Sequence, residues 1–136
     1  MEVAYDNRCF GCGALNEEGL RLHFEPPDGE GVVRTRFTIP PRYQSWAGVV
    51  HGGVVALLLD EAVGWAAWHA GQPGVTGRLE VRFRQPLKVG EEVEICGRLE
   101  RSRRSLAYVS AWVSRVADGA LVAEGSATLM AVEVAT

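Results

Sequence analysis

Hydrophobic and polar residues alternate along most of this chain, but one long segment departs from the alternation. Residues 52 to 69 are nearly all apolar or small, interrupted only by Asp60 and Glu61 before the histidine at the end. A helix that is apolar on all sides is a buried helix. Gly71 and Pro73 follow the segment and are residues that stop helices. The pattern therefore predicts one long buried helix from about Gly52 to His69.

Period-two alternation predicts strands on both sides of this helix. Turn residues at Gly90, at 102–105 and at 118–119 separate the last four strands, which we expect to form an antiparallel meander. The expected strands span residues 20–24, 33–39, 75–83, 93–99, 106–116 and 121–132. One helix cannot cover such a sheet from outside, so a curved sheet of five to six strands wrapped round a central helix is the expected α+β fold.

The bulk properties restrict the class of protein. We expect the 136 residues to form a single domain over 1–136, with an irregular arm at 1–19. The net charge of −3 gives no reason to expect a nucleic-acid partner. The start of the chain is acidic and resembles no signal peptide, and Asp60 and Glu61 interrupt the longest apolar run. The expected setting is cytoplasmic, with no membrane partner.

The chemistry suggested by the sequence lies at the start of the predicted helix. Gly52 and Gly53 supply backbone amides at its positive dipole end, and Asp60 is a carboxylate within the apolar run. Burying an unpaired carboxylate is costly, so such a group is usually retained for a reason. Amide donors for a negative oxygen together with a carboxylate indicate acyl-transfer chemistry. Glu61 points in another direction from Asp60, and we expect it to face solvent or form a salt bridge. If Asp60 faces away from the site, Glu61 is the alternative base.

Three segments together resemble a known family. His51, Gly52 and Gly53 are followed after six residues by Asp60, as in the hotdog-fold acyl-CoA thioesterases of the phenylacetate-degradation type. The segment 9–13, with the asparagine, glycine and leucine at 16, 19 and 20, is similar to the amino-terminal signature of one branch of that family. The segment 76–86, which ends at a proline, is also similar to its family counterpart.

The resemblance implies a function and a role for each matching residue. It implies hydrolysis of an acyl-CoA to a carboxylic acid and free coenzyme A, with no cofactor and no metal. Asp60 matches the nucleophile or general base, and the Gly52 amide is the candidate oxyanion donor. His51 matches a residue that orients the loop and substrate, and Thr76 lies where the family places a Ser or Thr beside the aspartate. A non-catalytic binding protein for acyl-CoA or another hydrophobic ligand is the alternative.

The candidate substrate-binding residues are less specific. Relatives often carry an asparagine that positions water where this chain has Ser45, and Gln44 is a possible substitute. Gly53 adds a second amide near the substrate. Arginine suits phosphate recognition, although a solvated surface explains these arginines equally well. The candidates for the phosphates of coenzyme A are Arg82, Arg84, Arg103 and Arg104.

The Cys9 and Cys12 pair resembles half of a zinc site, but no second pair follows it in the sequence. We therefore expect these residues to be structural, as small buried hydrophobes.

The spacing along the helix also bears on assembly. Gly52 and Asp60 are separated by about 12 Å of helical rise, too far to reach one carbonyl carbon from the same helix. We therefore expect a homodimer or homotetramer with active sites at the dimer interface, where the helices of two chains supply the two groups.

Overall fold

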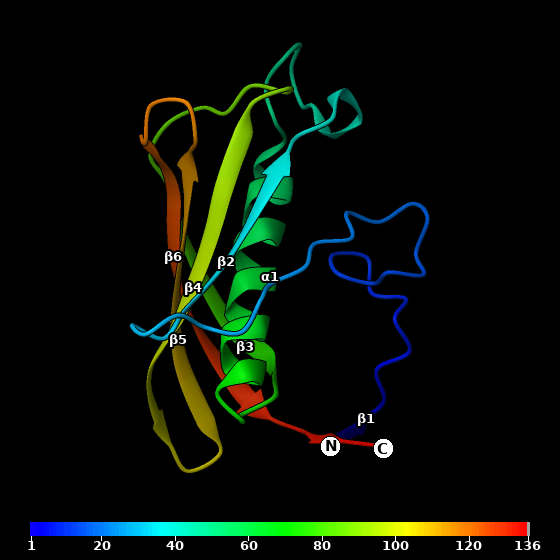
Figure 1. Cartoon of the computed structure of the whole chain (residues 1–136), viewed down its shortest axis with the longest axis vertical. Helices are drawn as coiled ribbons and strands as arrows, with labels where there is room; N and C mark the ends of the chain where they lie inside the picture. Colours follow the sequence, from blue (N-terminus) through cyan, green and yellow to red (C-terminus); the bar gives the residue numbers. More distant parts are fainter. Residues whose placement is uncertain (136) are drawn as a thin grey trace.

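The computed structural model describes residues 1–135 and contains one long helix packed against a five-stranded antiparallel sheet (Figure 1). A short 3₁₀ helix precedes the long helix, and a separate two-stranded parallel sheet joins the two ends of the chain. The elements are β1 (Glu2–Val3), β2 (Val32–Thr38), η1 (Pro41–Tyr43), α1 (Gly52–His69), β3 (Gly74–Phe83), β4 (Glu92–Arg103), β5 (Leu106–Arg115), β6 (Leu121–Ala131) and β7 (Glu133–Val134).

The limits of α1 agree with the prediction from the sequence. His51 caps its start, because the ring Nδ1 accepts a hydrogen bond of 2.9 Å from the Gly53 amide. Ala70 follows the last helical residue, and Gly71 then has a φ of 76°. This left-handed conformation commonly ends a helix, and glycine adopts it with little strain. Among the described residues, no helix is long and apolar enough to cross a membrane.

The strand order is β2-β4-β5-β6-β3, so the expected four-strand meander is wrong in one respect. Strands β4, β5 and β6 do follow one another through hairpins, at residues 104–105 and 116–120. Strand β3 instead pairs with β6 at the far edge of the sheet. Gly90 therefore lies in a connection that leads from one part of the sheet to another. Alternation shows which face of a strand is dry but not which strand is its neighbour.

Helix α1 is buried on the side that faces the sheet and half-buried or exposed elsewhere. Its buried side chains are Val55, Leu58, Leu59, Ala62, Val63, Ala66 and Ala67. The approach to the sheet is close, because a Cβ on Gly97 of β4 would lie 2.5 Å from the carbonyl oxygen of Ala62. The expectation of a helix buried on all sides is therefore wrong for the single chain, since the sheet covers one side alone.

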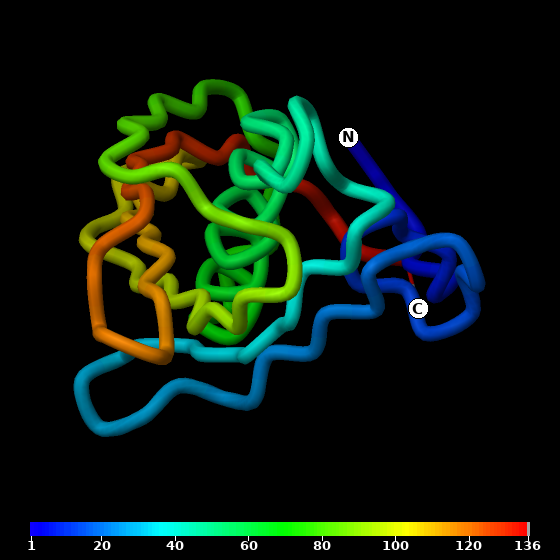
Figure 2. Tube along the Cα trace, turned by 90° about the horizontal axis from the view of Figure 1, so that it is seen from above, coloured from blue at the N-terminus to red at the C-terminus, as the bar shows by residue number. Residues whose placement is uncertain are grey.

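The amino-terminal arm, residues 1–19, lies on the side of α1 away from the sheet, and residues 20–31 then run across towards the sheet and β2 (Figure 2). The predicted strand at 20–24 does not form. Leu20, Leu22 and Phe24 are buried as the alternation indicated, but their segment has no strand partner. The amides of Leu20 and Leu22 instead donate to the carbonyls of Phe10 and Gly11. The burial pattern was sound, but an extended segment can bury alternate residues without joining a sheet.

Candidate active site

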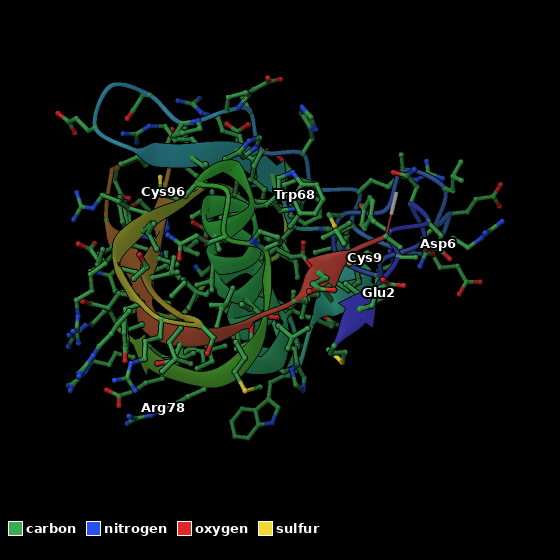
Figure 3. The ribbon with its side chains drawn as sticks, turned by 90° about the horizontal axis from the view of Figure 1, so that it is seen from below. Glu2, Asp6, Cys9, Trp68, Arg78 and Cys96 are labelled. Carbon is green, nitrogen blue, oxygen red and sulfur yellow. The ribbon has the colours of Figure 1, made fainter. Side chains whose placement is uncertain are left out.

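A pocket of about 470 Å³ opens between the second half of α1, the start of β3 and the arm. Figure 3 shows that Trp68 lies on the same side of the helix as Cys9 of the arm, away from Cys96 of the sheet. The pocket combines two carboxylates with an aromatic wall. Its lining residues are Tyr5, Cys12, Asp60, Glu61, Gly64, Trp65, Trp68, Gly74, Val75 and Thr76.

Asp60 and Thr76 meet in this pocket. The Thr76 hydroxyl donates a hydrogen bond of 2.7 Å to Oδ1 of Asp60, which joins the middle of α1 to the start of β3. This bond fixes one carboxylate oxygen, and Oδ2 has no hydrogen-bond partner within residues 1–135. A carboxylate held by one oxygen presents its other oxygen to a ligand in the pocket.

A β-bulge at Gly77 turns Thr76 towards the helix. In the pairing of β3 with β6, Thr76 lies opposite Leu129 and Arg78 opposite Thr128, so Gly77 is an extra residue. Simple alternation would place Thr76 on the wet face of the strand with Arg78. The bulge shifts the alternation by one residue and brings Thr76 to the face of the buried Leu129.

Asp60 is half-buried, not fully enclosed, and Thr76 is exposed. This corrects the expectation of a fully buried carboxylate. Asp60 belongs to the side of the helix that the sheet leaves uncovered. No ion pair among residues 1–135 includes Asp60.

The start of α1 forms a second, separate hollow. This hollow has a volume of about 280 Å³ and is lined by residues that include Gly52, Phe83 and Arg84. The Gly53 amide is already bound to the ring of His51. Within the described chain, no hydrogen bond uses the amide of Gly52. Gly52 is thus the exposed amide that is free to meet a ligand, whereas Gly53 serves the helix cap.

Gln44 and Ser45 hold the loop before the helix. The Gln44 Oε1 accepts a hydrogen bond of 3.0 Å from the amide of Gly48. The Ser45 hydroxyl donates one of 3.2 Å to the carbonyl of Val49. In the single chain both side chains therefore contact their own loop, and neither lines the Asp60 pocket.

The four candidate arginines do not converge on one place. Arg84 lines the Gly52 hollow and pairs with Glu124 at 2.8 Å. Arg82 lies 3.8 Å from Glu80. Arg103 and Arg104 lie at the exposed β4–β5 hairpin, where Arg104 lines a hollow with residues 71–73. The structure of one chain gives none of them a contact with Asp60.

Glu61 is half-buried against the arm and forms no salt bridge within residues 1–135, which corrects the expectation for this residue. Its carboxylate contacts the arm, where the Cys9 thiol donates to Glu61 Oε1 over 3.5 Å. Burial, together with the charge of the neighbouring Asp60, raises the pKa of Glu61. Burial also raises the pKa of the Cys12 thiol to about 12. The sequence signal for this cluster was the Cys-x-x-Cys motif, but nothing in the linear spacing linked it to Glu61.

Tyr5 and the two tryptophans form the aromatic wall of the pocket. Tyr5 and Trp65 meet edge to face with centroids 6.2 Å apart, and Trp65 contacts Trp68 in the same way at 5.8 Å. Sequence reasoning missed Tyr5 because the arm carries no periodic pattern. Trp68 is 41% exposed and also lines the pocket.

Comparison with known proteins places the chain among its relatives. Residues 47–121 match the sequence profile of the thioesterase superfamily. Acyl-coenzyme A thioesterase 13 of Homo sapiens is 28% identical over 100 residues, which cover 72% of this chain and 71% of that protein.

Solved structures support the same placement. A thioesterase superfamily protein of 27% identity superposes with a TM-score of 0.84 over 91% of this chain, which spans 60% of that longer chain. A phenylacetic acid degradation-related putative thioesterase from Ralstonia eutropha is 26% identical, with a TM-score of 0.72 over 82% of this chain and 83% of that one. The helix against a five-stranded antiparallel sheet is the hotdog fold, and the chain belongs to the thioesterase superfamily of thioester hydrolases.

Proposed function

We propose that this protein hydrolyses acyl-CoA thioesters to a free carboxylic acid and coenzyme A, with Asp60 as the nucleophile or general base. The observation that carries the proposal is the hydrogen bond from Thr76 to Asp60 at a pocket with an aromatic wall. The relatives named acyl-coenzyme A thioesterase 13 support the substrate class. Two solved hotdog structures bound to coenzyme A or acetyl-CoA support it further, although at 19% and 23% identity they establish only the fold.

The two roles of Asp60 differ in the first step. As a general base, Asp60 takes a proton from water, and the hydroxide attacks the thioester carbonyl carbon. As a nucleophile, an Asp60 oxygen attacks that carbon and forms a mixed anhydride, which water then cleaves. In both routes the carbonyl oxygen becomes negative, the carbon–sulfur bond breaks, and coenzyme A leaves as a thiolate that takes up a proton.

The Gly52 amide is the proposed donor for the negative oxygen. It is exposed, opens α1 and has no partner within the described part of the chain. In one chain it lies in a different hollow from Asp60. We therefore infer that two chains build each site, with Gly52 and its neighbour His51 from one and Asp60 and Thr76 from the other.

The edge strand supports such a dimer. Strand β3 lies at one end of the sheet order and runs from Gly74 to Phe83, so one side of its backbone has no strand partner within residues 1–135. A long unpaired edge is a template for pairing with another chain. Phe83 at the end of β3 has an exposed fraction of 58%, and Met130 of the adjacent strand β6 has an exposed fraction of 48%. Pairing of β3 with its copy would cover this edge.

Substitution of Asp60 tests the proposal. Asp60→Asn is nearly isosteric and should fold normally, but it removes the base or nucleophile, so kcat should fall by roughly 10³ or more. Turnover is measured on a panel of acyl-CoA substrates with a dye that reacts with the released thiol. Asp118→Asn makes the same chemical change on the distant β5–β6 hairpin and should leave turnover near wild type.

Two outcomes separate the alternatives. A folded Asp60→Asn protein with near wild-type turnover would show that Asp60 is not the catalytic group. Wild-type protein that binds acyl-CoA without hydrolysing any member of the panel would favour the non-catalytic binding protein. Single turnover in ¹⁸O-labelled water then tests for the nucleophile, because label in Asp60 indicates an anhydride opened at the Asp60 carbonyl. A general base puts label in the product alone, and trapping of the acyl-enzyme with hydroxylamine separates this route from an anhydride opened at the acyl carbon.

A further inference from the structure

The arm and the helix bring together three potential metal ligands. The Sγ atoms of Cys9 and Cys12 and a carboxylate oxygen of Glu61 lie within 4.8 Å of one another. The three residues come from positions 9, 12 and 61, so the fold and not the sequence unites them. All three are partly buried.

The backbone around this cluster is built for close approach. A Cβ on Gly11 would lie 2.1 Å from Glu61 Oε1, so glycine lets the arm lie directly on the carboxylate without displacing it. A Cβ on Gly13 would lie 2.4 Å from the amide nitrogen of Cys9. The Gly13 amide also donates to the Cys9 carbonyl at 2.9 Å, which closes the turn that carries both thiols. The donor atoms are thus positioned by the protein backbone.

The cluster has no positive charge to balance it. No ion pair within residues 1–135 includes Glu61, and its described neighbours are two thiols, the neutral Trp65 indole and the carboxylate of Asp60. A partly desolvated carboxylate is expensive to retain unless it is paired or coordinates a metal. A divalent cation would supply the missing charge.

The donor set matches one class of metal. Thiolate sulfur and carboxylate oxygen are zinc ligands, and at zinc bond lengths neighbouring donors lie roughly 3.5–3.8 Å apart. The Cys9 Sγ to Glu61 Oε1 distance is 3.5 Å. Calcium and magnesium prefer oxygen ligands alone, so the two sulfurs argue against them. Small side-chain rotations would bring the three donors round one ion.

We propose that Cys9, Cys12 and Glu61 bind a Zn²⁺ ion, or a divalent ion of the same ligand preference, that fastens the arm to α1 beside the Asp60 pocket. Both thiols lose their protons on binding, as zinc coordination requires. The fourth position faces the pocket, where Tyr5 lies 3.2 Å from the Cys12 sulfur, and holds a water molecule. The metal fixes the arm and takes no part in thioester hydrolysis, so this proposal stands apart from the proposed function.

Metal binding by the full chain is the direct test. Metal-free reduced protein is titrated with Zn²⁺ against a chromogenic chelator, and the metal content of protein purified without chelator is measured by mass spectrometry. The wild type should bind about one ion per chain. Co²⁺ in place of Zn²⁺ should give the near-ultraviolet charge-transfer band of a thiolate–cobalt bond.

Matched variants locate the site. Cys9→Ser, Cys12→Ser and the nearly isosteric Glu61→Gln should each weaken Zn²⁺ binding by more than about 100-fold, beyond the effect of losing an outer-shell partner. Cys96→Ser removes the remaining cysteine, which is buried in β4, and should bind as the wild type does. Removal of zinc should also speed proteolytic cleavage of the arm in the wild type and leave the Glu61→Gln protein unchanged.

Three results would overturn the proposal. The first is reduced wild-type protein that takes up no Zn²⁺ at micromolar concentration. The second is unchanged binding in the Cys9→Ser, Cys12→Ser double variant. The third is a Glu61→Gln protein that binds as tightly as the wild type. Because the first measurement uses unaltered protein, it holds even where a variant fails to fold.

Discussion

At the scale of single residues, the proposed site depends on one hydroxyl and one carboxylate. Thr76 fixes Oδ1 of Asp60 by a hydrogen bond of 2.7 Å. A hydrogen bond to a charged group contributes about 1.5–3 kcal/mol. In an open pocket a carboxylate without this partner would rotate, and fewer of its orientations would suit attack on a carbonyl carbon.

Thr76 can be tested without changing the shape of the strand. Thr76→Val removes the hydroxyl and keeps the β-branched form, so kcat should fall roughly 10- to 100-fold, the rate equivalent of the lost bond. Thr76→Ser keeps the hydroxyl and should retain most of the activity. The measurement is kcat on the best acyl-CoA, with folding checked by thermal unfolding. Equal activity in the Val and Ser variants would show that the hydroxyl has no role.

At the scale of elements, the bulge in β3 decides which way Thr76 points. Gly77 is the extra residue opposite β6, and it separates Thr76 from the regular alternation of Leu79 and Val81. Bulges often re-aim a side chain next to an active site. The bulge and not the strand propensity of threonine therefore brings the hydroxyl to the helix.

Deletion of Gly77 tests whether this pairing alone sets the face of Thr76. With one residue fewer, Thr76 directly precedes Arg78, so regular pairing would keep it opposite Leu129 on the dry face, and kcat should stay within about a few-fold of wild type. Gly77→Ala keeps the residue count, and its new methyl would meet the Met130 side chain at an ordinary 3.4 Å. It should therefore keep most of the activity. A deletion variant that folds but loses activity as far as Thr76→Val would show that this pairing does not by itself direct the hydroxyl to the helix.

At the scale of the whole molecule, the two parts of the proposed site lie apart within one chain. The Asp60 pocket and the Gly52 hollow have separate linings, and β3 leaves a free edge. Antiparallel helices related by a two-fold axis would place Gly52 of one chain near Asp60 of the other. The inferred dimer thus joins the two parts and pairs the edge in a single contact.

A mixing experiment tests this arrangement. Asp60→Ala and Gly52→Pro should each be nearly inactive, the second because proline lacks the amide donor yet suits the first position of a helix. After joint refolding in equal amounts, mixed dimers have one intact site, so about a quarter of wild-type activity should return. Gly52→Ala keeps the amide and should be far less impaired than Gly52→Pro. Mixed dimers that form, as seen by mass spectrometry, but remain inactive would rule out a shared site.

The sequence alone determined the features that depend on local chemistry. The apolar run, and the glycine and proline that follow it, predicted α1 from Gly52 to His69. Alternation located all five strands of the main sheet. These features follow from which residues avoid water and which backbones tolerate a turn, and both are properties of short segments.

Only the tertiary structure decided the features that depend on neighbours. Alternation could not reveal that β3 pairs with β6, or that the bulge at Gly77 reverses the face of Thr76. Nor could it place Glu61 against Cys9 and Cys12, because Cys9 and Glu61 are 52 positions apart in the sequence. Periodicity records how much of a residue is buried, whereas the partner that buries it is chosen by long-range packing.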